Sequence, residues 1–182
     1  MKGMVFTEFL EMVETFYGEE MVDHLLDTTE LDSGGAYTAV GTYNHQEMVE
    51  LVQRLSDEVD TPVADLLHLY GRHLFGQFSI NYSRLFLSLD DCFEFLKTIN
   101  DHIHVEVRKL YPEAELPRIA TRKIGAHQLE VVYESERPFA DFAAGLIDGA
   151  IHHFGETITV ERLATTEPAN NRATFLLTRS RS

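Results

Sequence analysis

Cysteine is almost absent from the chain, which has only Cys92 among its 182 residues. An intrachain disulfide is therefore excluded, and a cytoplasmic, reducing location is expected. Long apolar runs are also missing, since none approaches the ~20 residues that a membrane-spanning helix needs. Acidic residues interrupt the apolar pattern of residues 1–11, which predicts a helix there rather than a signal peptide. Cys92 itself is expected to be a small apolar filler, not a redox switch.

Basic residues are scarce as well. The chain has 15 Lys and Arg against 30 Asp and Glu, which gives a formal net charge of −15. Phosphate backbones and anionic lipid would repel such a chain, and no basic stripe offsets the charge. Nucleic acid and membranes are therefore not expected as partners.

The composition is otherwise that of one globular domain, with 44% hydrophobic and 25% charged residues. No linker, repeat or low-complexity segment divides the chain. We therefore predict a single domain over residues 1–182, with a helical N-terminal part of about residues 1–60 and a second part of about residues 61–182.

Apolar residues recur at helical spacing along most of the chain. The spacing predicts helices over residues 4–17, 21–26, 45–55, 62–75, 92–110 and 139–154. Asn44 and Glu47 resemble a capping box at the start of the third helix, and Thr61-Pro62 is a start signal for the fourth. Residues 79–88 carry no clear pattern.

The period changes after residue 117. Alternation predicts a strand over residues 127–133, and two β-rich runs, 157–163 and 173–178, flank a polar segment, which indicates a hairpin. The predicted fold class is α+β, mainly helical, with a small and mostly antiparallel sheet and flanking helices.

Two histidines stand out on the fifth predicted helix, His102 and His104. Helical positions two apart point to different faces, so this pair cannot chelate one metal ion. Ile103 and Val107 belong to the apolar stripe, which makes His104 the better candidate for the inward side. A buried structural histidine is one interpretation; the other is a haem ligand, because a single helical histidine over an apolar pocket can hold haem iron.

A second pattern follows the predicted strand. Tyr133, Ser135 and Arg137 would share one face if residues 133–137 are extended. Two hydroxyls and a guanidinium suit a carboxylate or phosphate, and haem carries two propionates. The alternative is a solvated strand edge.

Taken together, three motifs resemble the haem-nitric oxide/oxygen binding (H-NOX) family, bacterial relatives of the haem domain of soluble guanylate cyclase. They are Met1-Lys2-Gly3, the run from His104 through Pro112 to Leu116-Pro117, and Tyr-x-Ser-x-Arg at residues 133–137. The resemblance covers nearly the whole chain. It implies a haem b group buried between the two parts of the domain.

The resemblance also assigns roles to single residues. His104 matches the iron ligand, Pro117 matches the proline that distorts the haem, and Tyr133, Ser135 and Arg137 match the propionate clamp. Other family positions line the side of the haem opposite the ligand histidine; they match Val5, Phe9, Leu74, Phe142 and Leu146. Ordinary core packing is the alternative for these five, and both can hold, because a haem pocket is a core that contains a flat ligand.

The residue at position 142 indicates which gases such a haem would bind. Oxygen on ferrous haem carries partial negative charge and needs a nearby hydrogen-bond donor. Relatives that hold oxygen have a tyrosine where this chain has Phe142, while Phe9 and Leu74 also lack a donor. The expectation is therefore binding of nitric oxide and carbon monoxide without a stable oxygen complex, unless His73 turns into the pocket.

The family resemblance also implies a signalling role without catalysis. Nitric oxide would weaken the iron–His104 bond, strain at Pro117 would relax, and the helix that carries His104 would move. The implied partner is a histidine kinase or a cyclic-di-GMP enzyme. A zinc site found in some relatives is not expected, because no cysteine follows Cys92 and adjacent residues such as His152 and His153 diverge on a helix.

Two alternatives remain. The chain could bind haem as an oxygen-binding protein or as an enzyme such as a peroxidase, although peroxide chemistry wants a histidine and usually an arginine beside the reacting oxygen. It could instead bind no haem and act as an acidic protein–protein interaction module with a structural His104. The colour of the purified protein separates this second alternative from the others.

Overall fold

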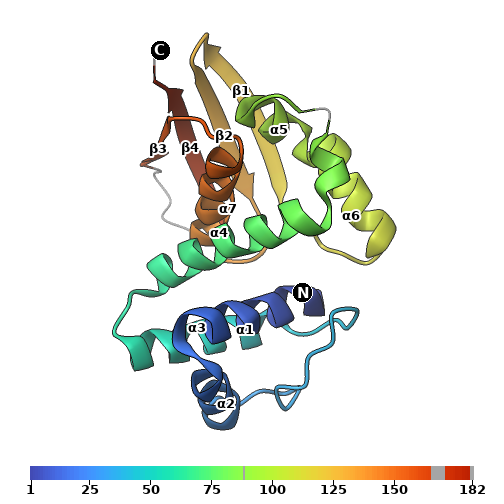
Figure 1. Cartoon of the computed structure of the whole chain (residues 1–182), viewed down its shortest axis with the longest axis vertical. Helices are drawn as coiled ribbons and strands as arrows, with labels where there is room; N and C mark the ends of the chain where they lie inside the picture. The colour runs from blue at the N-terminus through green and yellow to red at the C-terminus, as the bar shows by residue number, and fades with distance from the viewer. Residues whose placement is uncertain (88, 165–170, 181–182) are drawn as a thin grey trace.

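The computed structural model describes residues 1–87, 89–164 and 171–180. A helical N-terminal layer lies against a second layer in which helices cover a sheet (Figure 1). The N-terminal layer contains α1 (Gly3–Tyr17), α2 (Glu19–Thr28) and α3 (His45–Val59). The long helix α4 (Val63–Asn81) runs between the two layers.

The predicted helix over residues 92–110 is divided into three pieces. A 3-10 turn, η1 (Ser83–Phe86), precedes α5 (Cys92–Thr98), which is followed by a π-helical turn, η2 (Ile99–Ile103), and by α6 (His104–Leu110). The prediction of one regular α-helix was wrong at this point. π-helical turns are rare and accompany functional sites more often than chance.

The sheet has four antiparallel strands in the order β1-β2-β4-β3. They are β1 (Arg118–Gly125), β2 (Gln128–Glu134), β3 (Ile158–Leu163) and β4 (Arg172–Arg179). The predicted hairpin is confirmed by antiparallel pairing of β3 with β4, although residues 165–170 of its turn lie outside the described residues. The edge strand β1 was missed. Its charged residues alternate too weakly with apolar residues to predict a strand.

Two separate hydrophobic cores give the fold its two layers. The N-terminal core holds side chains of α1, α2 and α3, and the second core holds those of the sheet, α5 and α7 (Ala140–His153). Helix α4 belongs to both, since its Leu66, Leu67 and Tyr70 pack in the N-terminal core while Phe75 packs in the second. The boundary between the cores therefore runs along α4 itself.

Glycines let α4 and α7 approach very closely. A Cβ atom on Gly145 of α7 would lie 2.0 Å from the carbonyl oxygen of His68, and one on Gly71 of α4 would lie 2.3 Å from that of Phe142. These obstacles are backbone atoms, which cannot move aside as a flexible side chain can. The crossing therefore requires glycine on both helices, and it fixes Phe142 relative to α4.

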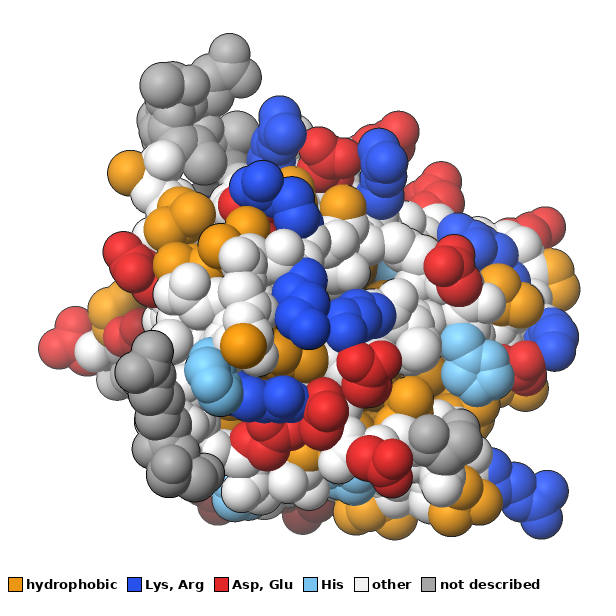
Figure 2. Space-filling model, turned by 90° about the horizontal axis from the view of Figure 1, so that it is seen from above, with side chains coloured by type: hydrophobic (Ala, Val, Ile, Leu, Met, Phe, Trp, Pro, Cys, Tyr) orange, Lys and Arg blue, Asp and Glu red, His pale blue; other side chains and the backbone are white. Residues whose placement is uncertain are grey.

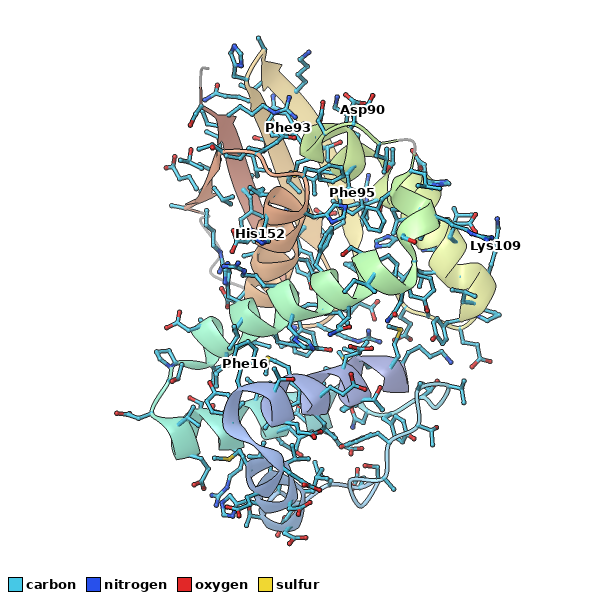
Figure 3. All side chains as sticks on the ribbon, in the orientation of Figure 1. Phe16, Asp90, Phe93, Phe95, Lys109 and His152 are labelled. Carbon is cyan, nitrogen blue, oxygen red and sulfur yellow. The ribbon has the colours of Figure 1, made fainter. Side chains whose placement is uncertain are left out.

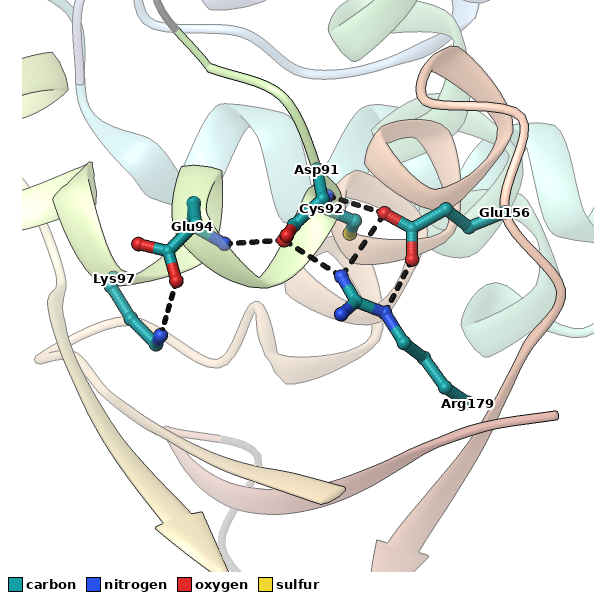
Figure 4. A network of polar contacts seen from close by, with 6 residues as sticks. All are labelled: Asp91, Cys92, Glu94, Lys97, Glu156 and Arg179. Carbon is teal, nitrogen blue, oxygen red and sulfur yellow. Dashed lines mark hydrogen bonds and ion pairs between the residues drawn. The ribbon is translucent and has the colours of Figure 1, made fainter. Parts of the chain in front are cut away.

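An ion-pair network fastens the start of α5 to the end of the chain (Figure 4). The Arg179 guanidinium lies 2.7 Å from the Asp91 carboxylate and donates to Glu156 at 2.5 Å. Glu156 also accepts a hydrogen bond from the backbone N–H of Cys92 at 2.7 Å. The Arg179 guanidinium lies over the Phe93 ring, with its central carbon 4.1 Å from the ring centroid. Three distant segments therefore meet at this helix start.

The capping box predicted at residue 44 forms only in part. The Asn44 side chain caps α3 by accepting from the N–H of Gln46. Glu47, however, turns to the preceding loop, where it accepts from Ser33 at 2.5 Å and from the Tyr37 hydroxyl at 2.7 Å. A tertiary contact has replaced the local one, so that Glu47 is buried.

Charges of both signs share the surface. On the face shown in Figure 2, Lys and Arg side chains are interspersed with Asp and Glu side chains. Some are paired directly; Arg122, for example, donates to Glu130 at 2.9 Å. Among the described helices, none is both long and apolar enough to cross a membrane.

Candidate functional site

A largely apolar cavity lies where the two cores meet. Three helices, α1, α4 and α7, contribute one set of lining side chains, which we call the apolar wall: Met4, Val5, Leu74, Phe75, Phe78, Phe142, Ala143, Leu146 and Ile147. A second set comes from η2 and α6, which we call the His104 segment (residues 99–110): Ile99, Ile103, His104 and Val107. The cavity is therefore built from both layers of the fold.

His104 is the first residue of α6 and lines the cavity, whereas His102 is exposed. The inward direction predicted for His104 is confirmed. Burial, with a smaller contribution from Arg108, lowers the pKa of His104 to about 4. Its imidazole is therefore neutral at physiological pH, which is the form that binds a metal ion.

The part of α6 that follows His104 is held loosely. Helix α6 buries none of its residues, and its Val105 and Leu110 are 40% and 55% exposed. Figure 3 shows Lys109 on α6 pointing away from the protein, whereas Phe95 on α5 is buried in the second core. Beyond His104, Val107 is the residue of α6 that packs against the second core, and it is only partly buried.

The three residues of the predicted clamp reach the same cavity by a different route from the one predicted. Only Tyr133 lies on β2, which ends at Glu134. Ser135 follows directly after β2, and its hydroxyl accepts at 3.1 Å from the N–H of Arg137, which lies in the bend of residues 136–138. Tyr133, Ser135 and Arg137 all line the cavity. The strand and its direct continuation therefore place Tyr133 and Ser135, and the bend that follows places Arg137.

The chemistry of these residues suits an anionic group. Burial raises the pKa of Tyr133, so its hydroxyl stays protonated and can donate. The Arg137 side chain, 15% exposed, donates to the backbone carbonyl of Glu115 and forms an ion pair with its carboxylate. The guanidinium is thus positioned at the cavity with a carboxylate already beside it.

The N-terminus also belongs to the cavity, which the sequence reasoning missed as a site feature. Met1 and Lys2 line it, and the Met1 ammonium donates to the backbone carbonyl of Tyr43 at 2.7 Å. Burial and then the nearby Arg137 lower the pKa of this amine. Tyr111, at the end of α6, was likewise not predicted as a lining residue. A polar residue just outside an apolar stripe gives no sign of lining a cavity.

The apolar wall contains four of the five residues predicted for it. Val5, Leu74, Phe142 and Leu146 line the cavity. Phe9 does not line the cavity. It is buried in the N-terminal core, where its ring packs edge-on against that of Tyr70, with 5.4 Å between the ring centroids.

Two nearby polar side chains stay off the cavity lining. The Tyr70 ring lies 5.0 Å from that of Phe142, but its hydroxyl donates to the backbone carbonyl of Val5 at 2.5 Å. His73 does not line the cavity either, and burial lowers its pKa. Its buried Nε2 has no hydrogen-bond partner among the described residues. No side chain of the apolar wall carries an N–H or O–H group.

The residues present fit a haem group in their chemistry. A flat apolar ligand would match the apolar lining, and the neutral imidazole of His104 could bind iron. Tyr133, Ser135 and Arg137 could hydrogen-bond carboxylates at one end of the same cavity.

Comparison with known proteins agrees with this geometry. The family model for Haem-NO-binding domains matches residues 2–162. The chain belongs to the H-NOX family. Members of this family are haem-based gas sensors.

Solved H-NOX structures resemble the chain over its whole length. The ferrous unliganded H-NOX protein from K. algicida has a TM-score of 0.92 and 37% identity, and the match covers 100% of this chain and 98% of that one. The H-NOX from Shewanella woodyi, bound to IWP-051 in the Fe(II)CO state, has a TM-score of 0.83 and 41% identity over 99% and 95% of the two chains. A third, from S. oneidensis in the Fe(II)NO state, has a TM-score of 0.90 and 25% identity over 100% of both. No match was found among curated protein sequences.

Pro117 is also a lining residue of the cavity. Pro117 lines the cavity directly before β1 begins at Arg118, and Leu116 and Ile119 line it as well. The cavity thus meets a rigid proline ring on one side and His104 from α6 on another. The assignment of Pro117 as the residue that distorts the haem stays a prediction, as do the other haem contacts.

Proposed function

We propose that this H-NOX protein senses nitric oxide, and also binds carbon monoxide, at a ferrous haem b held by His104, without forming a stable oxygen complex. The observation that carries the proposal is the apolar wall, in which α1, α4 and α7 present no hydrogen-bond donor to the cavity. Bound oxygen depends on such a donor, because it takes partial negative charge from the iron. Nitric oxide and carbon monoxide depend on it far less.

The nearest hydroxyl supports the same conclusion. Tyr70 packs against Phe142, yet its proton is already donated to the Val5 carbonyl, and burial raises its pKa well above the ordinary value. To serve a bound gas, Tyr70 would have to give up that hydrogen bond, which contributes about 0.5–1.5 kcal/mol. Tyr70 is therefore a structural hydroxyl.

Related proteins support the choice of ligands. Solved H-NOX structures from S. oneidensis and Shewanella woodyi carry nitric oxide or carbon monoxide on Fe(II). Those statements concern the relatives; for this chain, they support a cavity of the same kind with the same gases.

The clamp and the ligand have separate tasks in the proposal. His104 would bind the iron through its neutral imidazole. Tyr133, Ser135 and Arg137 would hold the propionates, and Arg137 would exchange Glu115, whose side chain is 75% exposed, for a propionate at little cost. The haem, when bound, supplies the gas-binding iron.

Signalling would use the loosely held part of the site. Helix α6 buries no residue, so little packing is lost when His104 separates from the iron and α6 moves. Such a movement alters the surface that a separate protein can read. The proposed partner is a histidine kinase or a cyclic-di-GMP enzyme in the cytoplasm, and the domain itself has no catalytic task.

Absorption spectra of the purified, reduced protein test this proposal, alone, in air, and with each gas. We expect a haem Soret band that shifts with nitric oxide and carbon monoxide and ignores oxygen. His104→Gly should lose the native iron ligation and regain it with added imidazole, while the exposed His102→Gly serves as the control. A stable oxygen complex would favour the oxygen-binding alternative, and a colourless protein that takes up no haem would favour the interaction module.

A further inference from the structure

The His104 segment is attached to the sheet through one side chain of its π-helical turn. Asn100 lies in η2, four residues before His104. Its amide nitrogen donates to the backbone carbonyl of Ile119, and its amide oxygen accepts from the backbone N–H of the same residue at 3.2 Å. One side chain therefore satisfies both backbone groups of one strand residue.

Ile119 is placed at the centre of the site. It lies two residues after Pro117 on β1, lines the cavity, and pairs across the sheet with Tyr133 of the clamp. In an antiparallel ladder, a residue whose N–H and C=O point away from its partner strand presents both groups along the free edge. Strand β1 is an edge strand, and the Asn100 side chain hydrogen-bonds to its free edge at Ile119.

The π-helical turn and the exposed helix give this contact its importance. Upstream, α5 is anchored by four buried residues and by the Arg179 network. Downstream, α6 buries none. Asn100 is thus the last polar attachment before His104, and its neighbours Asp101 and His102 are exposed.

We propose that Asn100 is a positioning residue that ties the His104 helix to the strand following Pro117, and so sets the distance between the iron ligand and the haem-facing proline. This rests on the proposed haem function. Movement of α6 would then pivot at Asn100, with α5 staying in place. A merely structural role, the capping of an edge strand, would instead lower stability without altering the geometry of His104.

Two variants and two controls separate these roles. Asn100→Leu removes both hydrogen bonds, and Asn100→Asp keeps the shape and the acceptor but loses the donor at neutral pH, which leaves a carboxylate oxygen facing a carbonyl. Asp101→Ala changes an exposed neighbour in the same turn. Arg179→Gln weakens the other anchor of the same helical segment and is the control for general loss of stability.

The first measurement is hydrogen exchange at the Ile119 amide, which reports the contact whether or not haem is bound. The second is the iron–histidine stretching band of the ferrous unliganded protein, which reports how His104 is held. In Asn100→Leu, which removes the acceptor of the Ile119 N–H, we expect exchange to become about fivefold to tenfold faster, as for the loss of one hydrogen bond. In Asn100→Asp, which keeps that acceptor, exchange should change less. In both variants we expect the band to broaden and move to lower frequency. Asp101→Ala should change neither, and Arg179→Gln should lower stability without moving the band.

Each other result has a definite meaning. An unchanged band in an Asn100 variant that folds and binds haem overturns the positioning role, and an equal shift in Arg179→Gln reduces Asn100 to a structural residue. If Asn100→Leu does not fold, Asn100→Asp decides alone. A wild-type protein that shows no iron–histidine band contradicts the proposed function instead. Exchange at the Ile119 amide still shows whether Asn100 contacts Ile119.

Discussion

The apolar wall and the His104 segment face the same cavity, but they are built in opposite ways. In the wall, α4 and α7 cross at glycines so closely that backbone meets backbone. In the His104 segment, a π-helical turn leads into a helix with no fully buried residue. The comparison indicates that the apolar wall is rigid, whereas the His104 segment can move. A sensor needs both, since a ligand shifts an equilibrium only between defined states.

The largest effect is expected from crowding the wall. Gly145→Val should destabilise the protein by about 3 kcal/mol or more, because even a Cβ atom would collide with the His68 carbonyl. A lower midpoint in thermal unfolding would show this. Gly76→Ala, on the same α4 that Gly145 meets, is the matched control: its Cβ has nothing within 4 Å, so Ala should be neutral or stabilising. Equal effects of the two changes would contradict a tight crossing.

The second prediction concerns the charge of His104. Because its folded pKa is about 4 and an unfolded histidine has a pKa near 6.5, the folded state resists protonation. Haem-free protein should therefore have its full stability above pH 6.5 and lose on the order of 2 kcal/mol as the pH falls towards 4. Urea unfolding against pH measures the slope. His104→Leu should flatten it and His102→Leu should not; a slope that survives in His104→Leu would place its origin elsewhere.

The third prediction gives the wall the donor that it lacks. Phe142→Tyr should place a hydroxyl at the cavity and slow oxygen dissociation by about tenfold, which corresponds to one hydrogen bond to a partly charged group. Stopped-flow absorption after mixing the oxygen complex with an oxygen scavenger and carbon monoxide measures the rate. Phe142→Leu, which changes the shape without adding a donor, controls for altered packing. If both variants bind oxygen equally, polarity is not what the wall contributes.

The smallest effect is expected on the surface of α6. Leu110 is 55% exposed and packs in neither core, so Leu110→Ser should change the free energy of unfolding by less than about 0.5 kcal/mol. Chemical denaturation of the two proteins side by side measures it. A loss of 2 kcal/mol would mean that α6 is anchored, and the contrast with the wall would then disappear.

Helical spacing was enough to predict most of the wall. It indicated α1, α4 and α7, and it separated inward His104 from outward His102, because side chains on a helix repeat with a fixed period. The family motifs then pointed to Tyr133, Ser135 and Arg137 as a group. Their grouping at the cavity is observed, although Arg137 reaches it from a bend after β2 instead of from a continuous strand.

Contacts between distant polar residues were beyond such reasoning. Glu47 had a local partner in the predicted capping box, yet it binds Ser33 and Tyr37 across a loop. Asn100 looked like any polar residue on a helix, and strand β1, which it contacts, had no pattern of its own. Hydrogen bonds between such residues leave no period in the sequence, because they depend on where the chain returns.

The sequence by itself determined the family, the two-layer α+β class and the direction of His104, since these follow from local periodicity and from motifs with short spacing. Only the tertiary structure decided that Phe9 lies away from the cavity, that the N-terminus joins it, and that Asn100 of the His104 segment contacts the strand after Pro117. The physical reason is that burial follows local pattern, whereas the partners of polar groups are chosen when distant segments pack together.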